Sequence, residues 1–350
     1  MGIDDIITKN ISGWMVGDAP CSDIVISSRI RLARNIEGFP FPVALTEDKA
    51  QEVLDSVRGA VSKITTDSEE YSFIKMTEVS PLERFVLVEK HLISPQHAED
   101  PTGKGIAINQ DQVMSVMVNE EDHLRIQCIL PGLNFDEAWT KASATDDALE
   151  NSLDIAFGEK IGYLTACPTN VGTGLRASAM LHLPALVMTN QINKVLGVLP
   201  QLGLAVRGMY GEGSEAYGNL FQISNQVTLG KTEDDILANL SAVTKQIVEK
   251  ENEARKALLS QATEQLEDRV WRAIGILKNA RLITGQEALA LLSNVRIGLD
   301  LGILKHIPSE LFNELLVITS PAHLQYFTGH EMLPIERDKV RAETIRSRLG

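Results

Sequence analysis

The amino-acid sequence predicts an α+β fold, with a largely antiparallel sheet flanked by helices and an all-helical C-terminal region. The chain has 350 residues, a length typical of two domains at ~100–200 residues each. Short apolar runs bounded by Gly, Pro or Asn do not alternate regularly with helical segments, which argues against a doubly wound parallel sheet. After Ser260 the strand signals end, and helical periodicity interrupted by Gly and Pro continues to the C-terminus.

The elements of the first region follow from these patterns. Runs of five to seven residues predict strands at 72–77, 84–89, 113–118, 124–130, 204–209 and 219–223. Helical periodicity predicts helices at 46–63, 134–157, 175–186 and 233–259. Thr232, followed three residues later by Asp235, is a typical N-cap for the last of these helices. In the second region, helices are expected at 285–299, 308–317 and 321–327.

Charge divides the chain into two parts. The whole sequence carries 33 Lys+Arg and 47 Asp+Glu, a net charge of −14 that disfavours a nucleic-acid partner. Residues 1–254 hold 20 basic and 36 acidic side chains, whereas residues 255–350 hold 13 and 11. The change falls in the polar stretch 249–254, a solvated helix that few contacts should cross. We therefore expect domains at 1–254 and 255–350.

Targeting and redox signals indicate a cytoplasmic protein without a membrane partner. No apolar run approaches the ~18 residues of a membrane span. The N-terminus is acidic where a signal peptide would be basic. The three cysteines, Cys21, Cys128 and Cys167, are odd in number and scattered, which argues against a disulfide framework and a zinc site.

An alternation of arginine with apolar residues follows Ser27 and Ser28. On a strand, Arg29 and Arg31 would point to one face while Ile30 would point to the other. Two guanidinium groups on one sheet face form a rigid cradle for phosphate oxygens. The alternative is an edge strand with a solvated basic face.

Three further segments carry candidate chemistry. The stretch 119–126 places Glu121 and Arg125 beside other charges at the end of an apolar strand, which is either an acid/base site or a solvated turn. The stretch 167–176 is a Gly-rich turn after Cys167, expected to lead into a helix whose N-terminus would bind an anion and activate the thiol. The alternative for Cys167 is a small core residue. The stretch 207–212 is a loop with Arg207 and Glu212, or a plain surface loop.

Together these segments predict phosphoryl transfer. A nucleoside triphosphate needs fixed cations to spread charge on the transferring group, and such sites usually add Mg²⁺. The carboxylates indicate the acceptor. A guanidinium is a poor nucleophile while protonated, and two glutamates would orient it and take its proton. A nucleoside triphosphate and Mg²⁺ are therefore expected, and the resemblance described next implies that the nucleotide is ATP.

These segments, in this order and spacing, resemble the phosphagen (guanidino) kinases across about residues 20–240. The resemblance implies that five arginines hold the ATP phosphates, that His91 lies near the adenine, and that Cys167 is the active-site thiol. It implies that Glu121 and Glu212 hold the acceptor guanidinium. The implied nucleotide-binding residues are Ser27, Ser28, Arg29, Ile30, Arg31, His91, Arg125, Arg176, Ala177, Ser178, Ala179, Met180, Arg207, Gly208, Met209, Tyr210, Gly211 and Glu212.

Departures from that family indicate a subfamily. In small-molecule phosphagen kinases an all-helical domain precedes the arginine strand and supplies a loop over the acceptor. Here the strand begins at Ser27, and a helical domain follows instead. This resembles the bacterial protein-arginine kinases, which mark proteins for degradation in protein quality control and stress response. That resemblance suggests an activator protein and a Clp-type protease as partners. There are two alternatives: a small-molecule guanidino kinase, and a catalytically inactive protease adaptor that binds phosphoarginine. The presence of Glu121, Cys167 and Glu212 argues against an inactive protein, because a pure binding protein does not need all three.

Two expectations concern the C-terminal region. Its long apolar stretches, 288–292 and 311–318, exceed what a bundle of ~90 residues buries easily and predict a homodimer. The alternative is a self-contained bundle packed on the first domain. Residues 337–350 carry five basic and two acidic side chains. On a helix, Arg337 and Arg341 share a face with Asp338, and an arginine with a carboxylate suits phosphoarginine. The resemblance favours an allosteric phosphoarginine site over a solvated helix, at Arg337, Asp338, Lys339, Val340, Arg341 and Ala342.

Overall fold

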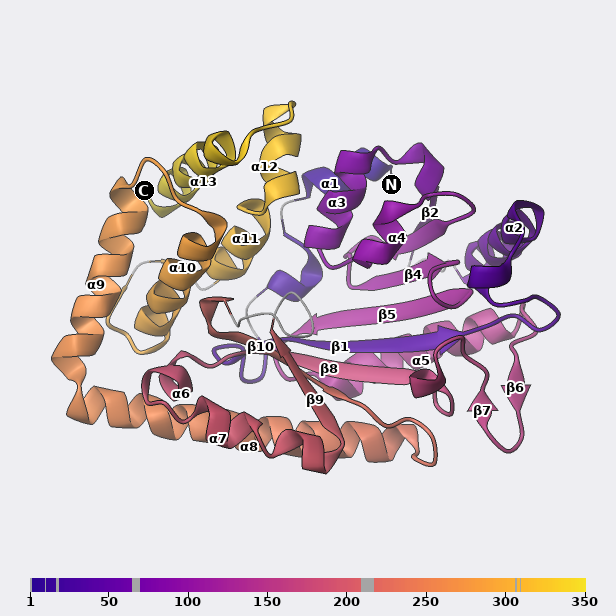
Figure 1. Ribbon diagram of the computed structural model, residues 1–350, viewed down its shortest axis with the longest axis horizontal. Coiled ribbons are helices and arrows are strands. Elements are labelled where there is room, and N and C mark those ends of the chain that lie inside the picture. The colour runs from indigo at the N-terminus through magenta and orange to yellow at the C-terminus, as the bar shows by residue number, and fades with distance from the viewer. Residues whose placement is uncertain are drawn as a thin grey trace.

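The computed structural model describes residues 2–9, 11–16, 19–64, 70–208, 217–305, 307–308 and 310–350. Its centre is an eight-stranded sheet of order β2-β3-β4-β5-β1-β8-β10-β9, in which all neighbours are antiparallel (Figure 1). These strands are β1 Val25–Arg34, β2 Tyr71–Lys75, β3 Gly105–Asn109, β4 Met114–Val118, β5 Leu124–Pro131, β8 Leu175–His182, β9 Leu204–Gly208 and β10 Leu220–Asn225. A small hairpin joins β6 Phe157–Gly158 to β7 Gly162–Tyr163. The α+β prediction is confirmed.

Helices surround this sheet and form the C-terminal region, where they gather beside it (Figure 1). They are α1 Ile3–Thr8, α2 Glu47–Ile64, α3 Pro81–Glu89, α4 Pro95–Glu99, α5 Phe135–Glu150, α6 Pro184–Met188, α7 Ile192–Leu196, α8 Glu233–Gln261, α9 Thr263–Asn279, α10 Gly285–Asp300, α11 Glu310–Ile318, α12 Pro321–Thr328 and α13 Pro334–Leu349. Within the described ranges, none of them has the length and apolar character needed to cross a bilayer.

The two faces of the sheet differ because side chains alternate along each strand. Ile30 and Leu32 of β1 are fully buried on one face, in a core shared with α2, α5 and α8. Arg29 and Arg31 point to the other face. Strand β1 lies between β5 and β8, so the alternative of a solvated edge strand is wrong.

Two predicted elements of the first region are wrong. Residues 84–89, predicted as a strand, lie in α3. Ser80 caps that helix, because its Oγ accepts a hydrogen bond from the Glu83 N–H while the Ser80 N–H donates to Glu83 Oε2. Residues 175–182, predicted to start a helix, form β8, in which Leu175, Ala177 and Ala179 are buried with a period of two. Tertiary burial overrides the helical pattern there.

The remaining predictions for the first region agree more closely. The N-cap at Thr232 is confirmed, because its side chain accepts from the Asp235 N–H. The helix expected at 134–157 begins as predicted but ends at Glu150. The sequence patterns did not predict β3, whose five residues are all buried.

Helix α8 runs without interruption through the expected domain boundary at residues 254 and 255. Arg255 is buried there, and it donates to Glu251 Oε1 at 3.0 Å and to Asp23 Oδ2 at 3.1 Å. Asp300 of α10 lies 3.5 Å from the same guanidinium. Buried ionic contacts therefore cross this point of the chain.

The C-terminal helices bury their own apolar stretches. Ala288, Leu289, Phe312 and Leu315 are each less than 10% exposed, within a cluster that joins α9, α10, α11 and α13 to Trp14 and to strands β1, β5 and β10. These residues are therefore buried within one chain, partly against the sheet. The apolar side chains that remain exposed lie elsewhere and include Trp271 on α9.

Candidate active site

Arginines from β5, β1, β8 and β9 share one face of the sheet, and β10 lies between the last two of these strands. Arg29 and Arg31 lie on β1, and Arg31 pairs with Arg176 of β8 in the strand register. Arg125 comes from β5, where it opposes Ala33, and Arg207 comes from β9. Because each guanidinium stands on a hydrogen-bonded strand, the backbone fixes the arrangement before any ligand arrives.

Burial and mutual repulsion make this cationic face unstable by itself. Burial, with Arg125 nearby, lowers the pKa of Arg29 to about 10. Burial, followed by the charges of Arg29 and Arg125, lowers the pKa of Arg31 far below its usual range. The Nε atom of Arg31 is buried without a hydrogen-bond partner. A polyanion would satisfy that donor and remove the repulsion.

A polar cavity of about 260 Å³ opens above these strands. It brings together six of the predicted site residues: Arg31, Glu121, Arg125, Cys167, Arg176 and Arg207. Its lining consists of Arg31, Leu32, Ala33, Glu120, Glu121, Asp122, Arg125, Cys167, Thr169, Asn170, Gly174, Arg176 and Arg207. Cations therefore line one part of the cavity, while carboxylates and a thiol line another.

The acidic turn between β4 and β5 contains three carboxylates with different environments. Glu120 forms a 2.6 Å ion pair with Arg125. Glu121 is exposed toward the cavity, and burial followed by the charge of Asp122 raises its pKa. A side-chain hydrogen bond between Glu121 and Cys167 acts in the opposite direction. Glu121 is thus the carboxylate of this turn placed next to the thiol.

Asp122 joins the acidic turn to the turn that carries Cys167. Its Oδ1 accepts hydrogen bonds of 2.6 Å from Asn35 Nδ2 and from the Ala166 N–H. Asn35 also accepts from the His123 N–H at 2.9 Å and donates to the Leu164 carbonyl at 2.9 Å. Asp122 and Asn35 are buried. These bonds fix the spacing between Glu121 and Cys167.

The turn after Cys167 leads into β8, not into a helix, so the predicted helix N-terminus beside the thiol is wrong. Residues Pro168–Asn170 form one 3₁₀ turn, and the Cys167 Sγ lies 3.0 Å from Thr169 Oγ1. Gly174 has φ +64, and a Cβ there would lie 2.7 Å from the Ala33 carbonyl oxygen. The glycine lets this turn cross close to β1.

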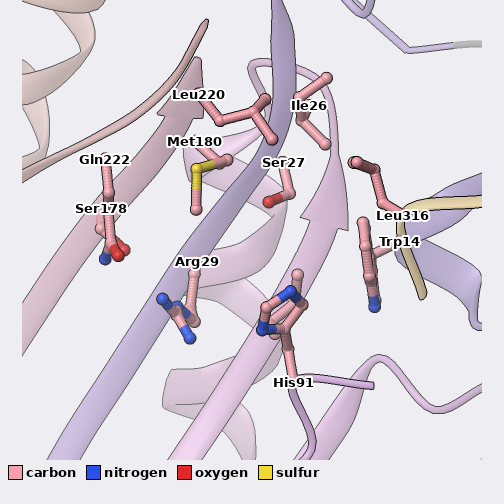
Figure 2. A pocket seen from close by; sticks show the side chains of 11 residues that line it. Trp14, Ile26, Ser27, Arg29, His91, Ser178, Met180, Leu220, Gln222 and Leu316 are labelled. Carbon is pink, nitrogen blue, oxygen red and sulfur yellow. The ribbon is translucent and has the colours of Figure 1, made fainter. Parts of the chain in front are cut away.

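A second cavity, more apolar, continues along the same sheet face (Figure 2). Arg29 borders it, and the His91 ring lies 5.4 Å from the Trp14 ring. The other lining residues are Ile26, Ser27, Ile129, Ser178, Met180, Leu220, Gln222 and Leu316. Burial, with the charge of Arg29, lowers the pKa of His91 to about 4, which keeps its ring neutral. A neutral aromatic wall beside an arginine suits a nucleotide base.

Some predicted site residues lie apart from both cavities. Ser28, Ile30, Ala177 and Ala179 are fully buried and line neither cavity, and Gly208 also lies outside both linings. Met209, Tyr210, Gly211 and Glu212 fall outside the described residues. Trp14, Gln222, Glu120, Asp122 and Leu316 line the cavities but were not predicted. Two of these, Glu120 and Asp122, stand beside Glu121 in the acidic turn.

The residues proposed for phosphoarginine are divided by burial on α13. Arg341 is buried, and it donates to the Thr319 carbonyl at 2.9 Å, to the Ile283 carbonyl at 3.0 Å and to Asp338 Oδ1 at 2.6 Å. Arg337 and Asp338 are half-buried, and Lys339 is exposed. Arg341 therefore holds Asp338 in place, and Arg337 is the more accessible of the two arginines.

Comparisons with known proteins match both regions of the chain. Residues 52–254 match the model of the ATP:guanido phosphotransferase C-terminal catalytic domain. Residues 263–350 match that of the protein-arginine kinase McsB C-terminal domain. A protein-arginine kinase of Halothermothrix orenii is 53% identical over the full length of both chains. One from Geobacillus stearothermophilus is 50% identical, covering 100% of this chain and 96% of the other.

Solved structures show the same fold. A lombricine kinase has a TM-score of 0.60 at 26% identity, covering 70% of each chain. The duplicated taurocyamine kinase of Schistosoma mansoni has a TM-score of 0.61 at 24% identity, covering 76% of this chain and 40% of the other.

Asp122→Ala tests the link between the two turns. The substitution removes the acceptor of the Ala166 N–H and one of the two acceptors of the Asn35 amide, at a cost of about 1–3 kcal/mol for each unsatisfied group. We expect a lower free energy of unfolding in urea and a turnover number reduced at least about tenfold, with ATP affinity within about twofold of wild type. Asp147→Ala, on the exposed side of α5, is the control. Unchanged turnover in Asp122→Ala would show that the link is not needed.

Proposed function

Because the chain belongs to the protein-arginine kinase family of ATP:guanido phosphotransferases, we propose that it transfers the γ-phosphoryl group of ATP to arginine side chains of proteins. The observation that carries this proposal is the polar cavity, which joins a cluster of arginines to Glu121 and Cys167. Cations for a triphosphate and a base for a guanidinium meet there.

The nucleotide enters as its magnesium complex. The described residues contain no group of three or more His, Cys, Asp or Glu side chains that could hold a metal ion. This fits Mg²⁺, which keeps several waters and is held largely by phosphate oxygens in kinase sites. The adenine occupies the apolar cavity, between the His91 ring and Met180 on the sheet. Arg29 borders that cavity, so the phosphates extend from Arg29 toward Arg31, Arg125, Arg176 and Arg207.

The acceptor arginine meets the carboxylate of Glu121. One guanidino nitrogen attacks the γ-phosphorus, a nitrogen–phosphorus bond forms, and the bond to the β–γ bridging oxygen breaks as ADP leaves. The proton of that nitrogen passes to Glu121. Its raised pKa makes Glu121 a stronger base than an ordinary glutamate. Glu212 is the proposed second carboxylate. Cys167, which is hydrogen-bonded to Glu121, is the proposed thiol beside the guanidinium.

The wider role follows from the family. We propose that phosphorylation marks proteins for degradation in protein quality control, in the cytoplasm and under stress. An activator protein and a Clp-type protease are the proposed partners. A homodimer stays a proposal, now supported by the exposed Trp271 and Ile276 of α9, which are 58% and 40% accessible.

A phosphoarginine site on α13 stays a proposal as well. Arg337 would bind the phosphoryl group, and Asp338 would accept from the guanidino N–H groups. The buried Arg341 holds Asp338 in position, because its Nη1 donates a hydrogen bond to Asp338 Oδ1. The site would be separate from the cavity that holds Glu121, and it would allow the reaction product to act allosterically.

The proposed reaction has a direct test. We expect incubation with ATP and an unfolded protein to give acid-labile phosphate on arginine, identified by mass spectrometry. Free arginine serves as the competing acceptor, and Glu121→Ala serves as the inactive control. Label found on free arginine alone would contradict the protein-kinase assignment and favour a small-molecule guanidino kinase.

Separate substitutions should distinguish the acceptor side from the phosphate side. We expect Glu121→Ala and Cys167→Ala to reduce turnover severely while ATP affinity stays near the wild-type value. Arg125→Ala, Arg176→Ala or Arg207→Ala should lower both the turnover number and the affinity for ATP. By analogy with other phosphoryl-transfer arginines, each substitution should reduce the rate by a factor on the order of 10³. Kinetics and calorimetric ATP titration measure the two effects. Full turnover in Cys167→Ala would make that cysteine a packing residue.

Calorimetry with phosphoarginine tests the site on α13. A Glu121→Ala variant, inactive in the main cavity, should still bind phosphoarginine, and a further Arg337→Ala or Asp338→Ala change should remove that binding. Arg348→Ala, which removes an arginine ion-paired to Glu314, controls for the loss of positive charge. Equal binding with and without Arg337 would assign α13 to the solvated-helix alternative.

A further inference from the structure

The C-terminal helices reach the apolar cavity in which the base is proposed to bind. Leu316 of α11 lines it together with Trp14, near His91 (Figure 2). Leu316 belongs to the C-terminal cluster and is only 5% exposed. One wall of the cavity is therefore built from a region more than 80 residues beyond the last sheet strand.

We propose that the corner between α11 and α12 forms a wall of the nucleotide-base pocket and that Glu89 is the positioning residue that holds this wall in place. The inference rests on the proposed function, because it assumes that the apolar cavity receives the adenine. It adds two residues, Leu316 and Glu89, to those that determine nucleotide affinity.

Glu89 anchors the N-terminus of α12. Its Oε1 accepts from the Ala322 N–H at 2.7 Å, and its Oε2 accepts from the His323 N–H at 2.8 Å. The Nδ1 of His323 lies 2.7 Å from the same Oε2. A carboxylate at this end of a helix satisfies free N–H groups and interacts favourably with the helix dipole. Thus one side chain of α3 fixes the start of α12.

Glu89 is also tied to the opposite wall of the cavity. It is the last residue of α3, and the turn that ends this helix places His91 at φ 60, a left-handed conformation that non-glycine residues rarely adopt. Gln127 Nε2 holds the His91 carbonyl at 2.8 Å. The Lys90 carbonyl accepts from Trp14 Nε1 at 3.3 Å. Displacing Glu89 would shift α12, His91 and Trp14 together.

This arrangement separates base recognition from phosphate recognition. The phosphate arginines stand on sheet strands, and all but Arg29 line the polar cavity, whereas Leu316 and Glu89 are not among the residues that line it. A defect in the wall should therefore weaken binding of ATP but not of inorganic tripolyphosphate, which has the charge and no base. General structural damage would weaken both.

The experiment compares ATP with tripolyphosphate by calorimetry on the full chain. We expect Leu316→Ala and Glu89→Gln to raise the Kd for ATP by about five- to tenfold, which is the size of effect expected when one buried contact with the base is lost. The Kd for tripolyphosphate should stay unchanged. The KM for ATP should rise while kcat at saturation stays near wild type. Glu99→Gln, exposed on α4, and the volume-conserving Leu316→Met are the controls.

Hydrogen exchange gives an independent measurement that needs no variant. In the wild-type protein, ATP should slow exchange at the Ala322 and His323 amides, and tripolyphosphate should not. Unchanged ATP affinity in both variants, parallel losses for ATP and tripolyphosphate, or exchange insensitive to ATP would each overturn the proposed wall. Absence of arginine phosphorylation by the wild-type protein would instead contradict the proposed function, and the comparison of the two ligands would still decide the wall.

Discussion

The clustering of arginines on one face of the sheet is the constraint on which the rest of the structure depends. Placing Arg29 and Arg31 two residues apart, with Arg125 and Arg176 on the adjacent strands, brings like charges together where burial already disfavours them. Such a face can persist only on a rigid support. The opposite face supplies it, because Ile30, Leu32 and their neighbours are fully buried against α2, α5 and α8.

Compensating contacts lie at the edges of this cluster. Glu120 neutralises Arg125. Arg34, at the end of β1, pairs with buried Asp146, lies 3.3 Å from the centre of the Tyr163 ring and donates to the Thr173 carbonyl. Arg34 therefore fixes the Gly-rich turn and leaves Arg31 available to an anion. In this way the same strand provides both binding cations and structural ones.

Sequence reasoning predicted the chemistry better than the local structure. Motifs such as Arg29 with Arg31, or Glu121 with Arg125, reveal function because their charges have no role in a core. The errors have local causes: the capping pair Ser80 and Glu83 makes α3 a helix, and burial with a period of two makes β8 a strand. Leu316 could not be predicted, because only the tertiary fold brings it to a cavity on the sheet.

The C-terminal helices join the catalytic region through polar contacts of the buried Arg255, so the two regions are mechanically connected. Arg255 of α8 binds Asp23 near the start of β1 and approaches Asp300 of α10. On α13, Arg341 binds the carbonyl of Thr319, which lies between α11 and α12. A displacement of Arg341 would therefore move Thr319. This residue lies between Leu316 of α11 and the N-terminus of α12, which Glu89 holds. A ligand that contacts Arg337 and Asp338 would sit directly on this connection, because Asp338 is bonded to Arg341.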